Sequence, residues 1–305
     1  GIFPDDLGSD YLPNVFSLQS AMTAEEEYHT SLLGITELLK YGTTCFLDPG
    51  STKYLDACMQ AYEESGCRII VGKHVTDKAN PINLPVYSTD QAVSLTEETI
   101  RRYDNRLEGR VRAWAMPFSV AFSTRELLVA AKELPEKYGT GLTLHHSSTR
   151  EPTASPAGRG ARRPTEYLEE IGALGPNVLL AHVLGLNEAE VDAIARTGTS
   201  VVMCPTAAIK GGTGMARTAM LPEMLQRGVT VGLGTDAANN SNLVETMRSM
   251  YLAAVLFKDG REDVTMVPAE TALEMATIQG ARAMGLADEI GSIEVGKKAD
   301  LVLFD

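Results

Sequence analysis

Short runs of apolar and β-branched residues alternate with helix-like segments through most of this chain. Seven such runs occur, and each is followed by a segment in which apolar residues recur with helical spacing. Strict alternation with short connections is typical of a parallel β-sheet, either closed as a barrel or doubly wound. The predicted strands are residues 43–48, 67–74, 111–118, 141–145, 178–182, 200–204 and 229–235.

The two ends of the chain depart from this alternation. Residues 1–22 are predicted to be an irregular loop, and residues 23–41 a helix that Thr23 caps, with Glu26 three residues on. A closed barrel needs eight strands, so we expect the missing first strand to precede Gly1. The tail predicts a helix and then, over residues 289–305, a hairpin that turns at 296–298. A hairpin needs a sheet to join. We therefore divide the chain into a barrel, 1–288, and a strand hairpin, 289–305.

Composition limits the class of protein. The chain has 305 residues, 44% hydrophobic and 22% charged, which are values of a globular protein. No apolar stretch reaches the roughly 20 residues that cross a bilayer. The net charge of −13 argues against nucleic acid or an anionic membrane as a partner. The four cysteines form no CxxC pair, and buried free thiols in a reducing cytoplasm are the simplest interpretation. A small molecule is the expected partner.

Three of the predicted strands end in residues that bind or serve metals. They end in His145, in His182 and, after the sequence Gly-Leu-Gly-Thr, in Asp236. In a β/α barrel all strand tips point into one mouth, so these residues are expected to converge. Imidazole and carboxylate groups on rigid strand tips are good ligands for a divalent metal. The pattern predicts a metal-assisted hydrolase.

Several longer motifs resemble those of the amidohydrolase superfamily, in the branch with atrazine chlorohydrolase, triazine hydrolase and the guanine- and cytosine-type deaminases. The resemblance runs almost from end to end and is most specific in the closing segment, residues 290–303. It implies a (β/α)8 TIM-type barrel, without its first strand in this chain, and remnants of a small composite β-sandwich at the C-terminus. The matching segments are residues 32–44, 144–145, 181–182, 202–206, 228–236, 275–285 and 290–303.

The resemblance also implies roles for the three strand-tip residues. His145 matches the metal ligand of the fifth barrel strand. His182 matches a histidine that orients or deprotonates the attacking water, and that is itself a ligand in two-metal relatives. Asp236 matches a carboxylate that touches the metal and accepts the water's proton. The family's His-x-His pair is absent from the chain, which has five histidines, and is expected just before Gly1.

This chain departs from the family's pattern at two places. Ser148 stands where the deaminases place a glutamate that protonates the substrate ring, and a hydroxyl cannot act as a general acid in that way. Ala207 and Ala208 follow Cys204-Pro-Thr206, where many relatives have Ser-Asn. The resemblance gives Cys204 a packing role.

The remaining candidates are weaker. Ser148, His74, Phe118 and Asn239 are expected to contact substrate, although packing or capping would explain the last three equally well. The loop 150–164, with Arg150, Arg159, Arg162 and Arg163, is expected to be a solvated loop. His146 is expected to point to the opposite side of its strand from His145 and to be structural.

The sequence thus predicts a hydrolase with one divalent metal, zinc by default with iron or cobalt as alternatives. His182 and Asp236 would activate water against an electron-poor carbon of a small N-heterocyclic or amide- or carbamate-like substrate. Two alternatives stay open. One is hydrolysis of C–Cl or C–S bonds in triazine- or thiocarbamate-like compounds, and the other is a non-catalytic barrel that binds a small molecule or a partner. The resemblance implies a homodimer.

Overall fold

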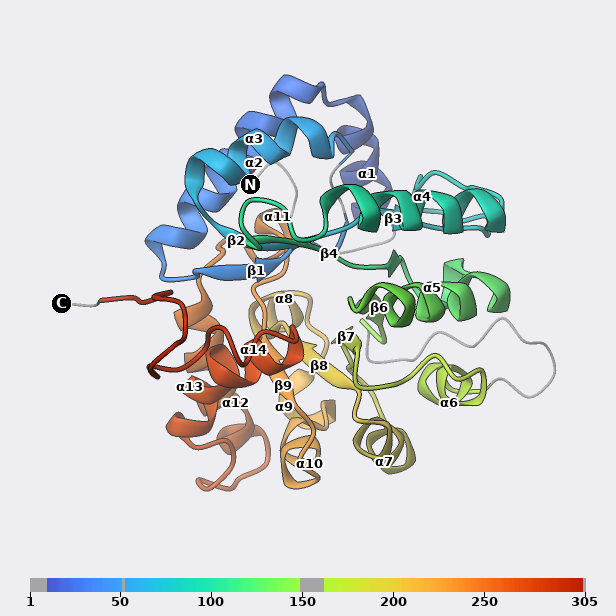
Figure 1. Ribbon diagram of the computed structural model, residues 1–305. Helices are drawn as coiled ribbons and strands as arrows, with labels where there is room; N and C mark the ends of the chain where they lie inside the picture. The colour runs from blue at the N-terminus through green and yellow to red at the C-terminus, as the bar shows by residue number, and fades with distance from the viewer. Residues whose placement is uncertain (1–9, 51–52, 149–161, 304–305) are drawn as a thin grey trace. The chain divides into compact units, whose positions relative to one another are not determined.

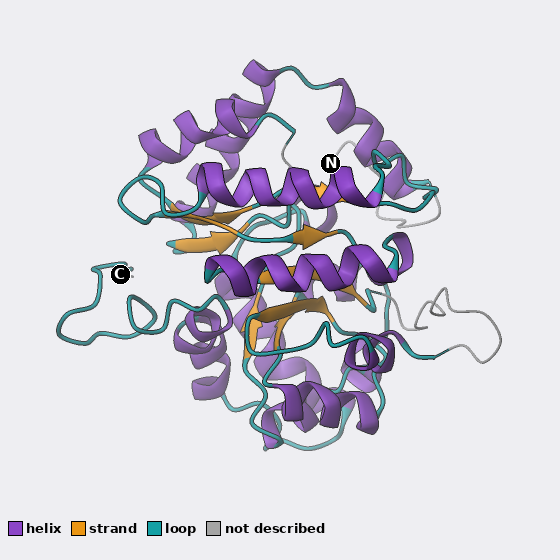
Figure 2. Ribbon diagram, turned by 45° about the vertical axis from the view of Figure 1, so that its right-hand side comes forward, coloured by secondary structure: helices purple, strands orange, loops and turns teal. Residues whose placement is uncertain are grey.

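The computed structural model describes residues 10–50, 53–148 and 162–303. The chain divides into two compact units, residues 1–144 and residues 145–305. Figure 1 shows the first unit in blue to green and the second in green to red. In both units helices lie beside the strands, as the purple and orange ribbons of Figure 2 show.

The first unit alternates helices with short strands. Its helices are α1 (Tyr11–Ala21), α2 (Ala24–Lys40), α3 (Leu55–Ser65), α4 (Thr89–Tyr103) and α5 (Arg125–Tyr138), with a 3-10 turn at Val120–Phe122. Its strands are β1 (Cys45–Leu47), β2 (Arg68–Val71), β3 (His74–Val75), β4 (Val111–Ala113) and β5 (Met116–Pro117).

Side-chain caps fix where several of these helices begin. Thr23 accepts the backbone N–H of Glu26, whose carboxylate in turn accepts the backbone N–H of Thr23, which confirms the predicted capping box of α2. Ser88 and Gln91 form the same arrangement at α4. The Thr124 side chain accepts the backbone N–H of Leu127 and so caps α5. Such caps satisfy backbone N–H groups that have no partner within the helix.

Parallel pairing organises the strands of this unit. The sheet order is β1-β2-β4, with Phe46 opposite Ile69 and Ile70 opposite Arg112, while β3 pairs with β5 separately. Buried side chains from β2 and β4 and from α2, α3 and α4 form an apolar core, whose burial stabilises the unit. This core contains Ile35, Leu55, Cys58, Ala61, Tyr62, Cys67, Ile69, Val71, Tyr103, Val111 and Ala113.

The second unit carries a four-stranded parallel sheet of order β6-β7-β8-β9. The strands are β6 (Leu142–His146), which begins in the first unit, β7 (Val178–His182), β8 (Ser200–Met203) and β9 (Val231–Leu233). The helices are α6 (Pro164–Glu170), α7 (Glu188–Thr197), α8 (Pro205–Lys210), α9 (Met215–Thr218), α10 (Leu221–Gln226), α11 (Ala238–Ser241), α12 (Thr246–Gly260), α13 (Ala269–Ala276) and α14 (Ile278–Ala283). Strand β7 matches its predicted bounds, and all seven predicted strand regions contain strand structure.

Several details differ from the sequence prediction. Helix α1 lies where an irregular loop was expected, and its Phe16 packs with Ile82 and Phe118. The predicted strands 67–74 and 111–118 are each divided in two, around Gly72 and around Trp114–Ala115. A Cβ at Gly72 would lie 2.8 Å from the carbonyl oxygen of Trp114, so the chain passes too closely there for any side chain.

The C-terminal part differs more. The helix predicted for the tail is divided at Thr277 into α13 and α14, and its apolar residue Leu273 is 55% exposed. Residues 291–303 form no strand, so the hairpin prediction does not hold in the described structure, although a turn occurs near Gly296. Ile293, Val295 and Leu303 are almost fully exposed. Strands form only where a partner sheet accepts their hydrogen bonds, and none pairs with this segment. The domain boundary at 288/289 remains a prediction.

None of the described helices is both long and apolar enough to span a bilayer.

Candidate functional site

The carboxyl ends of strands β6, β7 and β9 carry the three residues that the sequence singled out. His145 lies on β6, His182 is the last residue of β7, and Asp236 follows β9 by three residues. All three are half-buried. Parallel pairing continues past the ends of β6 and β7, because Val183 and Leu184 donate to the carbonyls of His146 and Ser147 at 2.9 and 2.8 Å. The two histidine-bearing tips are thereby held next to each other.

The backbone at these tips is strained. His182 has a φ of 78° and Asp236 a φ of 62°, and Ser147, next to the end of β6, has a φ of 46°. Non-glycine residues with positive φ cost free energy and persist only where surrounding structure holds them. Their gathering at three strand ends is typical of a functional site.

Donor atoms for a metal lie close together here. The ligand atoms of His182, Asp236 and Cys204 lie within 4.8 Å of one another. The imidazole ring of His145 is stacked on that of His182, with ring centroids 5.6 Å apart and an angle of 26° between the planes. Imidazole, carboxylate and thiolate are all donors that divalent transition metals accept, so these residues fit the implied cation. His182 therefore lies close both to Asp236 and to His145, as the sequence predicted.

Asp236 is anchored by its neighbours in sequence. The backbone N–H of Ala237 donates to Oδ1 at 2.6 Å, and Nδ2 of Asn240 donates to Oδ2 at 2.9 Å. Each carboxylate oxygen has a further lone pair, so these contacts leave acceptor capacity for a cation or a water molecule. Helix α11 begins two residues later at Ala238, with Ala237 as its N-cap. Asp236 therefore lies one residue before the N-cap, so helix capping does not explain its position.

Cys204 is the residue whose place at the site was not predicted. Its side chain is buried, and burial together with the negative charge of Asp236 raises the pKa of its thiol well above the usual value. Gly234 makes room for it, because a Cβ there would lie 3.0 Å from Sγ. The sequence carried a signal for this proximity, since Cys204 and Gly234 end neighbouring parallel strands.

His146 points away from this group, as expected for the next residue of a strand. It is buried and its Nε2 lies 2.8 Å from the hydroxyl of Thr165, which is fully buried. Burial, with the nearby charges of Arg163 and His182, lowers the pKa of His146 to about 4. The imidazole is neutral at physiological pH and anchors β6 from behind the site.

The expected substrate residues fall into two groups. In the first unit, the rings of His74 and Phe118 meet edge to face with centroids 4.9 Å apart, and Phe16 adds a third ring. Phe118 is buried in an aromatic cluster, so packing accounts for it. In the second unit, Ser148 is exposed and Asn239 is half-buried on α11.

The arginine-rich loop is described only at its end. Arg150 and Arg159 lie outside the described residues. Arg162 forms an exposed ion pair with Glu170, whereas Arg163 contacts Glu190 at 2.5 Å, and the side chain of Glu190 is fully buried. The prediction of a solvated loop is therefore wrong for Arg163, because the buried carboxylate of Glu190 requires a cationic partner.

Comparison with known proteins identifies the family. The family model described as "Amidohydrolase family" matches residues 3–305. The chain belongs to the amidohydrolase family. The predicted resemblance is thus confirmed, and with it the α/β fold of the TIM-barrel type.

Amidohydrolases with deaminase activity are prominent among the relatives of this chain. The 5'-deoxyadenosine deaminase of Methanobrevibacter smithii is 32% identical over 303 residues, which cover 99% of this chain and 67% of that protein. A zinc-bound adenosine deaminase from Xanthomonas campestris has a TM-score of 0.78 and 26% identity, covering 92% of this chain and 62% of the other.

A third protein is similar in fold. A variant of atrazine chlorohydrolase from Arthrobacter aurescens, in complex with zinc and atraton, has a TM-score of 0.81 and 22% identity and shares the fold. It covers 93% of this chain and 65% of that one. This amidohydrolase chain thus spans about two thirds of the length of these relatives.

Proposed function

We propose that this amidohydrolase is a metal-dependent hydrolase that releases an amine from an electron-poor carbon of a small N-heterocyclic substrate. The observation that carries the proposal is the approach of His182 and Asp236 to within 4.8 Å, with His145 stacked on His182. The deaminases among the relatives support the same reaction class.

We assign one divalent metal to His145, His182 and Asp236, with zinc as the default and iron or cobalt as alternatives. A bound divalent cation would lower the pKa of a water molecule toward about 7. Asp236, which Ala237 and Asn240 anchor, would accept a proton from water at this site, and His182 would orient the water toward the substrate carbon. Proton transfer by positioned groups of this kind typically contributes about 10²–10⁴-fold to the rate.

The proposed substrates are aminopurine nucleosides, because relatives carry the names 5'-deoxyadenosine deaminase and 5-methylthioadenosine/S-adenosylhomocysteine deaminase. We propose that Ser148 and Asn239, both in the second unit, contact substrate. The amide of Asn239 suits a polar edge of the substrate.

A second candidate reaction is hydrolysis of a C–Cl or C–S bond in a triazine- or thiocarbamate-like compound. Ser148 favours it: the exposed hydroxyl at this position cannot protonate a ring nitrogen as a carboxylic acid would. A good leaving group needs no such acid.

The test is to measure ammonia release from adenosine, 5'-deoxyadenosine and S-adenosylhomocysteine, and chloride release from a chlorinated triazine, with the zinc-supplemented protein. We expect ammonia release that a chelator abolishes and zinc restores. Chloride release without ammonia release would favour the second candidate. A protein that binds no metal under these conditions would contradict both and leave a non-catalytic binding protein.

We further propose a cytoplasmic homodimer that binds neither nucleic acid nor membrane, in keeping with the net charge of −13. Multi-angle light scattering tests the dimer, and a monomeric mass would contradict it.

A further inference from the structure

The carboxylate of Asp236 is held at both of its oxygens by two different kinds of donor. The backbone N–H of Ala237 reaches Oδ1 at 2.6 Å, and the side-chain amide of Asn240 reaches Oδ2 at 2.9 Å. The first donor is the adjacent backbone, which every residue type except proline would supply. The second depends on the side chain at position 240.

The amide of Asn240 makes this contact at a cost. Its Oδ1 is buried and has no hydrogen-bond partner among the described residues. A buried acceptor without a partner destabilises the folded state, because it has lost its hydrogen bonds to water. The hydrogen bond from the Asn240 amide to the charged carboxylate of Asp236 offsets this loss of stability.

The surrounding turn keeps Asn240 in this position. The hydroxyl of Ser241 contacts the carbonyls of Ala237 and Leu243 at 3.1 and 2.6 Å, and Ser241 is buried. Helix α11 spans only Ala238–Ser241, so these local bonds rather than a long helix hold it. The turn thus presents the Asn240 amide to a carboxylate whose own backbone lies at a φ of 62°.

The rotation of a carboxylate about its last side-chain bond is otherwise broad. With both oxygens held, one set of lone pairs faces the donors and the remaining set is fixed in direction. Because the ligand atoms of Asp236, His182 and Cys204 lie within 4.8 Å of one another, that direction decides how the carboxylate meets a cation and its water.

We propose that Asn240 is a positioning residue that fixes the carboxylate of Asp236 for metal binding and proton acceptance. This inference rests on the proposed function. Asn240 acts through Asp236 and contacts no reacting atom itself. Removing a hydrogen-bond partner of a metal ligand typically weakens metal affinity or activity about 10–100-fold.

The decisive variant is Asn240→Leu, which has nearly the same size and no donor. It deletes the bond to Asp236 and also the unpaired Oδ1, so the two effects on folding stability oppose each other. We expect an almost unchanged melting temperature of the metal-free protein together with an about 10–100-fold weaker affinity for Zn²⁺ or Co²⁺. The visible absorption bands of the cobalt form should also change, because they report the geometry around the ion.

Two further variants complete the design. Asn240→Gln retains an amide donor and should recover part of the affinity. Asn242→Gly is the matched control: Asn242 ends the same helix at a φ of 68°, which glycine tolerates, and its side chain contacts Lys210 rather than Asp236. It should bind the metal like the unmodified protein.

The outcomes separate the two proposals. If the unmodified protein binds Co²⁺ and Asn240→Leu binds it with the same affinity and the same spectrum, Asn240 has no positioning role while the proposed function stands. If Asn240→Leu loses melting temperature and nothing else, Asn240 is only part of the turn. If the unmodified protein binds neither ion, the proposed function and this inference both fail.

Discussion

Burial and the negative charge of Asp236 both favour the protonated form of the Cys204 thiol when no metal is bound. A thiol binds metals and acts as a nucleophile as the thiolate, yet the pKa of Cys204 is raised by burial and by the charge of Asp236. Cys204 is thus a protonated neighbour of His182 and Asp236 in the absence of metal. Its side chain fills the space that Gly234 leaves open, which agrees with a packing role.

We therefore expect Cys204→Ala to keep full metal stoichiometry. The cobalt form of the unmodified protein should show no thiolate-to-cobalt charge-transfer absorption in the near ultraviolet. Ultraviolet–visible titration with Co²⁺ checks both points. A charge-transfer band that disappears in Cys204→Ala would make the thiolate a ligand and would revise the ligand set proposed here.

The free energy of unfolding should depend on pH through His146. Its pKa in the folded protein is about 4, below the usual 6.5. The unfolded chain therefore binds a proton more readily between these values, so the contribution of the neutral imidazole is fully present above about pH 6.5 and is lost as the pH falls toward 4. The difference corresponds to about 3 kcal/mol.

The measurement is urea unfolding of the metal-free protein at several pH values. His146→Gln can still bond to Thr165 but cannot titrate, so its stability should fall less over this range. Equal pH dependence in both proteins would contradict the prediction.

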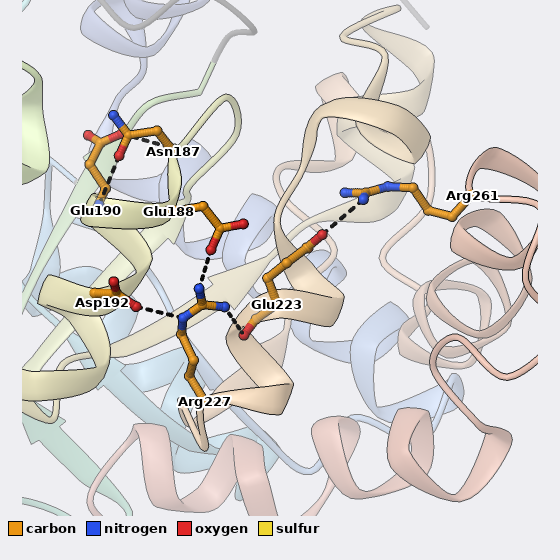
Figure 3. Close-up of polar contacts among 7 residues, drawn as sticks. All are labelled: Asn187, Glu188, Glu190, Asp192, Glu223, Arg227 and Arg261. Atoms are coloured by element: carbon orange, nitrogen blue, oxygen red, sulfur yellow. Dashed lines mark hydrogen bonds and ion pairs between the residues drawn. The ribbon is translucent and has the colours of Figure 1, made fainter.

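Helix α7 shows how one element combines buried and exposed charges. The side chain of Glu190 is fully buried, where it accepts from Nε of Arg163 and from the backbone N–H of Asn187, and Asn187 in turn caps the helix. Glu188 and Asp192, which are exposed on the same helix, both contact Arg227, as Figure 3 shows. Arg227 is the C-cap residue of α10. The two groups of charges have opposite environments within a few residues.

We expect Glu190→Ala to lower the free energy of unfolding by about 3–5 kcal/mol, because it leaves a guanidinium without its buried partner. Glu188→Ala on the same helix is the matched control. Its side chain is 64% exposed, and exposed ion pairs contribute only about 0–1 kcal/mol. Chemical denaturation measures both values. Equal losses would show that burial does not control these pairs.

For the whole protein, the strand tips that carry His145, His182 and Asp236 are also where the backbone is strained. Ligands that bind only the folded state stabilise it by mass action. A cation on these residues would therefore compensate for the strain that positive φ values impose on His182 and Asp236.

Removal of metal should accordingly lower the melting temperature. At about 100 times the dissociation constant, a metal adds about 2.7 kcal/mol to the free energy of unfolding. Differential scanning fluorimetry with and without zinc, after chelation, measures the shift. The double variant His182→Ala/Asp236→Ala should show no shift, and a zinc effect that survives in it would place the metal elsewhere.

Local sequence rules predicted much of this fold, for reasons that lie within a few residues of chain. The capping box at Thr23, the cap at Thr124, and the position of β7 follow from hydrogen-bonding side chains and apolar periodicity, which act locally. The placing of metal-binding residue types at strand ends was visible in the same way, and parallel pairing then made the approach of His182 to His145 predictable.

Contacts between distant segments decided the rest. Leu273, Val295 and Leu303 are exposed. An apolar sequence pattern alone does not supply the surface against which such residues pack. The closeness of Cys204 to Asp236 depends on the pairing of β8 with β9 and on the space at Gly234. The ion pair of Arg163 with Glu190 joins residues 27 apart in the chain. Periodicity carries no information about such distances, since burial and pairing energies arise only when the folded chain brings the groups together.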